Sequence, residues 1–176
     1  MPIQGLHHAA YRCKNARETV EFYNELLGMD FAMAMSEDRV PSTKEESPYM
    51  HIFFTLGSGF LAFFEIPESP PMGRDPNTPD WVQHIAMRID DMDELAAIKQ
   101  RLEARGIDVI GPIDHVLFKS IYFFDPNGHR LELTVSFATP DMMKRLRSEA
   151  RPMLEEWDKT RKVVRHAAWV HENEFA

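Results

Sequence analysis

Three residues of this 176-residue chain have the types and settings needed to hold a metal ion: His8, His84 and Glu132. Each histidine lies seven residues before a residue suited to cap a helix. Glu132 follows the turn-forming run Asp-Pro-Asn-Gly at residues 125–128. Two imidazoles and one carboxylate on separate strands can occupy one face of a metal ion and leave its other positions open. The pattern therefore predicts a site for chemistry on a bound substrate.

The segments around the two histidines repeat one pattern, which predicts a duplicated fold. A strand followed by a helix is expected after Leu6 and again after Val82, with Asn15 and Asp91 as the helix caps and a glycine after each helix. Three strand-like runs follow each helix: DFAMAM, YMHIFFTL and GFLAFFEI, then IDVIG, SIYFF and HRLELTV. This plan predicts an α+β protein made of two βαβββ modules.

Alternation along the strands predicts where the three residues point. Ile85 and Met87 belong to an apolar face suited to packing under a helix, so His84 points to the opposite side. By the same rule the side chains of His8 and Glu132 point away from the core face of their strands. If the two sheets curl together, the face with the three ligands becomes the inside of a cup.

The chain divides by composition into a domain of residues 1–138 and a helical C-terminal extension of residues 139–176. The modules within the domain are expected at about residues 5–68 and 80–136. The helix of the extension is expected to be interrupted near Pro152.

Residues 36–50 are polar, hold two prolines and lack periodicity, which predicts a long loop that covers the cup's mouth or lies plainly on the surface.

Charge and composition limit the partners. A formal net charge of −8 argues against nucleic acid, which requires a basic face. No apolar run is long enough for a membrane span, and no signal peptide opens the chain. The single cysteine, Cys13, excludes an internal disulfide and is expected to be a buried thiol. We therefore expect a cytoplasmic protein that acts on a small molecule.

The duplicated plan, the placement of His8 and His84 and the run DPNGHRLEL resemble the vicinal oxygen chelate superfamily. This superfamily groups glyoxalase I, bleomycin and fosfomycin resistance proteins, methylmalonyl-CoA epimerase and type I extradiol dioxygenases. The resemblance covers residues 5–136 and implies paired modules that form a cup-shaped, metal-binding half-barrel. It implies one divalent metal ion per chain on His8, His84 and Glu132, with Fe(II) favoured and Mn(II), Zn(II) or Ni(II) as alternatives. A homodimer is also expected.

Within that superfamily the sequence is most similar to the extradiol dioxygenases. Tyr122 stands ten residues before Glu132, and His115 closes a Gly-Pro-x-x-His run, as in those enzymes. The resemblance implies that His115 stabilises developing negative charge or moves a proton, and that Tyr122 donates a hydrogen bond at the metal. It also implies cleavage of a catechol-like, aromatic substrate. The acid–base histidine expected on the strand before His84 is missing, and His51 can replace it only if it lies in the cup.

Two other functions remain open. The first is a glyoxalase-type lyase or epimerase, whose fourth metal ligand comes from the last strand of the first module. This chain has Ala62 or Phe63 at that place, and Glu65 lies just past it as a candidate. The second is a non-catalytic resistance protein that binds a drug or another ligand. His129, beside the turn glycine, is expected at the surface.

Overall fold

Both predicted helix caps form in the computed structural model, which describes residues 2–171. The side chain of Asn15 accepts a hydrogen bond from the Glu18 amide at 2.9 Å, and Asp91 accepts one from the Glu94 amide at 2.8 Å. Gly28, at φ +75°, follows the first helical segment. The predicted helix starts are therefore confirmed.

Each predicted module forms one mixed four-stranded sheet with its helix. The first module contains β1 (His8–Cys13), α1 (Ala16–Val20), a π-helical continuation η1 (Glu21–Leu26), β2 (Phe31–Arg39), β3 (Glu46–Leu56) and β4 (Gly59–Glu65). The second contains β5 (Ile85–Arg88), α2 (Met92–Ala104), β6 (Ile110–Asp114), β7 (Phe118–Phe124) and β8 (Arg130–Ser136). Helix α3 (Pro140–Thr160) and the 3₁₀ turn η2 (Ala168–His171) follow.

The two sheets have the same topology. Their strand orders are β1-β4-β3-β2 and β5-β8-β7-β6. The pairs β1–β4 and β5–β8 are parallel, and the other pairs are antiparallel. This arrangement confirms the predicted α+β fold of paired βαβββ modules, which is open rather than closed, with a helical C-terminal extension.

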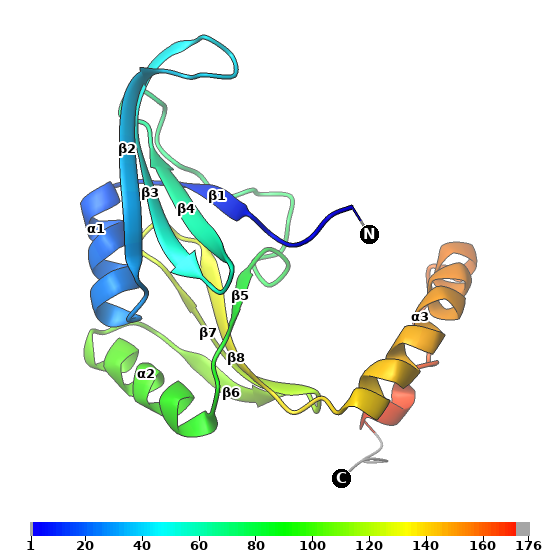
Figure 1. The fold of residues 1–176 in the computed structure, drawn as a ribbon. Helices are drawn as coiled ribbons and strands as arrows, with labels where there is room; N and C mark the ends of the chain where they lie inside the picture. The colour runs from blue at the N-terminus through cyan, green and yellow to red at the C-terminus, as the bar shows by residue number, and fades with distance from the viewer. Residues whose placement is uncertain (1, 172–176) are drawn as a thin grey trace.

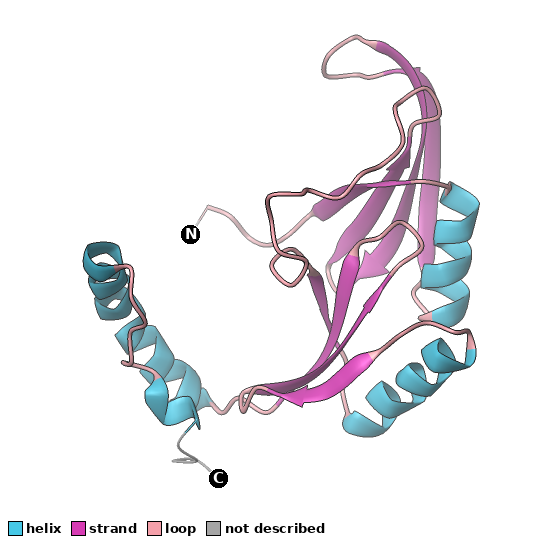
Figure 2. Cartoon of the chain, turned by 180° about the vertical axis from the view of Figure 1, so that it is seen from behind, coloured by secondary structure: helices cyan, strands magenta, loops and turns pink. Residues whose placement is uncertain are grey.

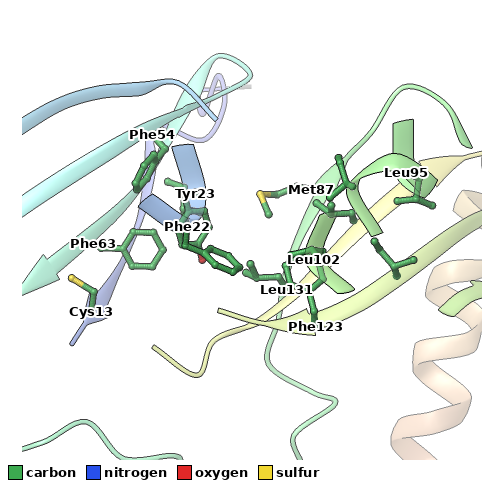
Figure 3. Close-up of a cluster of buried hydrophobic side chains, with 14 of the residues drawn as sticks. Cys13, Phe22, Tyr23, Phe54, Phe63, Met87, Leu95, Leu102, Phe123 and Leu131 are labelled. Carbon is green, nitrogen blue, oxygen red and sulfur yellow. The ribbon is translucent and has the colours of Figure 1, made fainter. Parts of the chain in front are cut away.

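One hydrophobic core joins the modules. Helices α1 and α2 lie side by side on one side of the molecule, with the sheets on the other (Figure 1). Figure 3 shows side chains from both modules in this core, among them Tyr23, Phe54 and Phe63 from the first and Leu95 and Leu131 from the second. Each sheet therefore has one face on the core and one open face.

Hydrogen bonds also cross between the modules. The buried Tyr23 hydroxyl donates to Asp125 at 3.1 Å, and the Lys14 amide donates to the Asn127 side chain at 2.8 Å. His129 Nε2 lies 2.7 Å from the Arg12 carbonyl, which can only accept, so the imidazole donates. The prediction of a surface position for His129 is therefore wrong, because its ring is half-buried between the modules.

The prediction of a long loop at residues 36–50 is also wrong. Strands β2 and β3 extend through most of it as a hairpin, and only residues 40–45 connect them. Arg39 and Glu46 form an ion pair at 2.5 Å, and the Ser36 hydroxyl donates to the Tyr49 carbonyl at 2.9 Å. This ribbon extends beyond the core with both faces of β2 exposed, so its sequence lacks the alternation that marks a half-buried strand.

The C-terminal extension differs in one detail from the prediction. Helix α3 continues through Pro152, although an interruption was expected there. The ring of Pro152 removes the hydrogen bond to the carbonyl of Ser148, which is an exposed residue whose carbonyl water can satisfy. The helix projects away from both sheets (Figure 2). Within residues 2–171, no helix is long and apolar enough to span a bilayer.

Candidate metal centre

His84 and Glu132 come together on the open face of the second sheet. His84 immediately precedes β5, and Glu132 lies on the neighbouring strand β8. His84 Nε2 lies 3.0 Å from Glu132 Oε2, and His84 Nδ1 lies 3.1 Å from the Val82 carbonyl. Because that carbonyl can only accept, Nδ1 donates to it, and Nε2 faces the carboxylate. An imidazole nitrogen and a carboxylate oxygen are both ligands of divalent metals, so the chemistry of this pair fits a metal ion.

The carboxylate of Glu132 is held by its other oxygen. Oε1 accepts hydrogen bonds from the Ser120 hydroxyl at 2.5 Å and from the Tyr122 hydroxyl at 3.1 Å. Both donors lie on β7, where Tyr122 pairs with Glu132. Ser120 and Glu132 are buried. The two strands therefore fix the carboxylate and leave Oε2 directed at His84.

The two residues with predicted catalytic roles belong to the same network. His115 Nε2 lies 2.9 Å from the Tyr122 hydroxyl, which itself donates to Glu132. His115 Nε2 must therefore donate to Tyr122, so a hydrogen-bonded chain runs from His115 through Tyr122 to Glu132. Burial, followed by the negative charge of Glu132, raises the pKa of Tyr122 and keeps it protonated as a donor.

Gly111 explains how His115 reaches this chain. Its φ of +108° lies in the region that favours glycine, and a Cβ atom there would lie 2.5 Å from the Ser120 carbonyl. Strand β6 can therefore approach β7 closely at this point, next to Ser120. The Gly-Pro-x-x-His run thus positions its histidine through a backbone contact that only glycine allows.

His8 lies on the other sheet. It begins β1, and its Nδ1 lies 2.8 Å from Nδ1 of His7, with the ring 6.1 Å from that of Phe53. His7 precedes the strand, so strand alternation does not separate the two rings. In residues 2–171 of one chain, no group of three or more His, Cys, Asp or Glu side chains is placed to hold a metal ion. The structure thus brings together two of the three predicted ligands, and His8 remains apart from them.

His51 is a further imidazole on the open face of the first sheet. It pairs with Phe64 on β4, where His8 pairs with Phe60, so strand parity places the two histidines on one face. Its side chain is 8% exposed and stacks on Phe64 at 3.5 Å between ring centroids. Burial, and to a lesser extent the charge of His8, lowers the pKa of His51 to about 4. His51 is therefore a neutral imidazole, and its Nε2 has no hydrogen-bond partner among the described residues.

Glu65 has a different role from the one considered for it. Its carboxylate accepts a hydrogen bond from the Ala16 amide at 2.6 Å, at the N-terminus of α1. Glu132 pairs with Ala86 on β5, and the corresponding residue of the first sheet, opposite Ala10, is Ala62. The first module therefore carries no carboxylate at the position that Glu132 occupies in the second.

Ser120 is a residue of this hydrogen-bond network that the sequence analysis missed. It lies two residues before Tyr122, so alternation places both on the face of β7 that meets Glu132. That spacing was available in the sequence, but a serine in an apolar strand gives no separate signal.

Comparison with known proteins places the chain in a family. The sequence model described as Glyoxalase/Bleomycin resistance protein/Dioxygenase superfamily matches residues 5–133. The protein named ring-cleaving dioxygenase MhqA from Bacillus subtilis (strain 168) is 27% identical over 139 residues, which are 76% of this chain and 41% of MhqA. This chain thus spans about two fifths of MhqA. Metallothiol transferase FosB from Staphylococcus epidermidis is 26% identical over 147 residues, covering 74% of this chain and 83% of FosB.

A solved structure has the same fold. The fosfomycin resistance protein FosX from Listeria monocytogenes, complexed with Mn(II) and a sulfate ion, superimposes with a TM-score of 0.55 at 20% identity. The match covers 81% of this chain and 98% of FosX. From the family match over most of its length and this shared fold, the chain belongs to the Glyoxalase/Bleomycin resistance protein/Dioxygenase superfamily, the vicinal oxygen chelate proteins.

Proposed function

We propose that this protein is a metal-dependent enzyme that binds one divalent ion per chain through His8, His84 and Glu132. The observation that carries the proposal is the geometry at Glu132: one oxygen is fixed by Ser120 and Tyr122, and the other lies 3.0 Å from Nε2 of His84. Ligands held in this way by neighbouring groups are typical of metal centres. FosX, which shares the fold, is complexed with Mn(II).

We further propose that the site is completed by two chains. His8 stands on the open face of the first sheet, whereas His84 and Glu132 stand on that of the second. The modules pack together through the opposite faces, around the core in Figure 3. Strands β1 and β5 are edge strands of their sheets. In a two-fold symmetric dimer, the first sheet of one chain would cover the second sheet of its partner, which gives two equivalent sites.

The reaction that we propose is the oxidative cleavage of a catechol-like ring. Fe(II) held by His8, His84 and Glu132 would lower the pKa of the substrate hydroxyls and would pass electron density from the substrate to dioxygen. Tyr122 stays protonated and donates its one proton to Glu132, so it positions the carboxylate at the metal. His115, on the far side of Tyr122, can accept a proton on Nδ1 when Nε2 carries its own. The hydrogen bonds among His115, Tyr122 and Glu132, together with the resemblance to MhqA, support this assignment.

Two alternatives are weighed against it. A glyoxalase-type lyase requires a fourth ligand, and the Glu65 carboxylate is already bound to the Ala16 amide. A metallothiol transferase is favoured by one observation, since the chain covers 83% of FosB. The metal centre proposed here serves that reaction as well, so the substrate distinguishes the two.

The test is oxygen uptake by protein purified without air and loaded with Fe(II). We expect oxygen consumption with at least one member of a series of substituted catechols, and its loss together with bound iron in the His84→Ala variant. The Thr134→Ala variant is a matched control, because this β8 hydroxyl has no hydrogen-bond partner within residues 2–171. No oxygen consumption across the series by the iron-loaded protein would sink the dioxygenase assignment.

A further inference from the structure

A cavity of about 720 Å³ lies beside the proposed metal centre. The segment that connects the two modules forms one wall, with residues 72–75, 78–80 and 82–83. The other wall includes His84, Phe124 and Arg130. The volume falls within the range of small-molecule sites. Because His84 lines the cavity, a molecule bound there can reach the metal centre.

The positively charged side chains that line this cavity differ in their hydrogen bonds and ion pairs. Lys14 Nζ donates to the Pro126 carbonyl at 2.9 Å. Arg74 forms an ion pair with Asp80 at 3.1 Å. Arg130 forms no hydrogen bond and no ion pair with any residue in the described part of the chain. Its guanidinium lies over the Tyr122 ring, 4.6 Å from the centroid. Arg130 therefore has its donors available to a ligand.

Arg130 is also placed at a useful distance from the metal centre. It lies two residues before Glu132 on β8, so both side chains leave the same face about 7 Å apart along the strand. It stacks on Tyr122, which itself donates to Glu132. A substrate whose two adjacent oxygens bind a metal held by His84 and Glu132 can thus present its opposite end to the guanidinium.

We propose that Arg130 binds an anionic group of the substrate, so that the substrate is a carboxylated catechol rather than a neutral one. The inference rests on the proposed function and adds the substrate class. A planar guanidinium matches a carboxylate through two parallel hydrogen bonds, and stacking on Tyr122 orients it in advance. Three cations, Lys14, Arg74 and Arg130, and two carboxylates, Asp75 and Asp80, line the cavity, so it is locally attractive to anions although the chain has a formal net charge of −8.

The test compares two probes on the Zn(II)-loaded protein, in which no turnover occurs. The probes are 3,4-dihydroxybenzoate and the neutral 4-methylcatechol, and isothermal titration calorimetry measures each dissociation constant. For the wild-type protein we expect binding of the carboxylated probe to be tighter by about tenfold or more. Arg130→Gln should remove this preference and leave 4-methylcatechol binding unchanged, and Arg130→Lys should keep part of it. Arg74→Gln is the matched control, since this cation of the same cavity is already paired with Asp80.

The outcomes separate the two proposals. If the wild-type protein binds both probes equally, or if Arg130→Gln keeps the preference for the carboxylated probe, the proposed role of Arg130 is wrong. The proposed metal centre is unaffected by that result. If Arg130→Gln weakens both probes to the same extent, Arg130 only supports Tyr122, and the inference is overturned. If neither catechol binds, the proposed catechol site itself fails and this inference fails with it.

Discussion

At the scale of single residues, the candidate site depends on the different contacts that the two oxygens of Glu132 make. Oε1 is occupied by Ser120 and Tyr122, which prevents the carboxylate from turning. Oε2 is thereby available at a fixed position opposite His84. A flexible carboxylate would lose rotational freedom on binding a metal, so the hydroxyl of Ser120 should contribute to metal affinity without touching the metal.

Ser120→Ala should weaken metal binding by about 10–100-fold, because the variant loses the 2.5 Å hydrogen bond that holds Glu132. Competition titration with a chelating dye measures this affinity. Thr134→Ala is the matched control, since Thr134 pairs with Ser120 across β7 and β8 but its hydroxyl has no partner in the described chain. Equal affinity in wild type and Ser120→Ala would show that Ser120 does not position the carboxylate.

The buried thiol of Cys13 permits a prediction about pH. Burial raises the pKa of Cys13 to about 11, so the thiol stays protonated in the folded protein through neutral and mildly alkaline pH. The thiolate is the reactive form. Iodoacetamide should therefore leave Cys13 unmodified at pH 8 in the native state and modify it quickly in urea, as mass spectrometry can follow. Rapid modification of the native protein at pH 8 would contradict this burial.

At the scale of elements, the N-terminus of α1 explains why Glu65 is not available to a metal. The Asn15 side chain accepts a hydrogen bond from the Glu18 amide, and the carboxylate of Glu65, at the end of β4, accepts one from the Ala16 amide. Both contacts satisfy amides that have no partner inside the helix. Glu65 therefore connects the last strand of the first sheet to the start of its helix.

Glu65→Ala should lower the free energy of unfolding by about 1 kcal/mol, the usual effect of losing a helix cap, with unchanged metal stoichiometry. Urea denaturation and metal analysis of the same sample measure the two quantities. Asp91→Ala, which removes the cap of α2, should give a similar loss and serves as the comparison. A fall in bound metal for Glu65→Ala alone would indicate that Glu65 is a ligand after all.

At the scale of the whole molecule, the open faces of the sheets are the main feature. The core and the hydrogen bonds between Tyr23 and Asp125 and between Lys14 and Asn127 fix the modules through their helix-covered side. On the open face of the first sheet, Nε2 of His51 is buried and has no hydrogen-bond partner within residues 2–171. Buried polar atoms are normally paired, so this face has the character of a surface that another group covers.

Complementation between variants tests the two-chain site. His8→Ala and Glu132→Ala proteins should each bind little metal, because each lesion then affects both sites of its homodimer. Heterodimers isolated by two different tags should contain one intact site, since both lesions fall in the other site. Metal analysis of the purified heterodimer measures the recovery. His84→Ala with Glu132→Ala is the control pair, in which every site keeps one lesion and no recovery is expected.

Absence of recovery in the first pair would contradict the two-chain site. A failure to isolate any heterodimer would contradict the dimer itself.

Local signals account for what could be predicted from the sequence. The caps at Asn15 and Asp91 and the alternation around Met87 depend only on neighbouring residues, so the helices, the strands and their core faces followed from them. The strand-like runs SIYFF and HRLELTV placed Tyr122 and Glu132 on consecutive strands, and the structure pairs the two residues. The β2–β3 hairpin lacked such a signal, because its extended part has no buried face.

The sequence alone therefore determined the duplicated α+β fold and the residues of each open face, since strand and helix periodicity are short-range properties. Only the tertiary structure decided which of those residues meet. It joined His115, Tyr122, Ser120, Glu132 and His84 on one sheet and left His8 on the other. The physical reason is that the docking of one module on the other depends on shape and burial across the whole core, which no local spacing encodes.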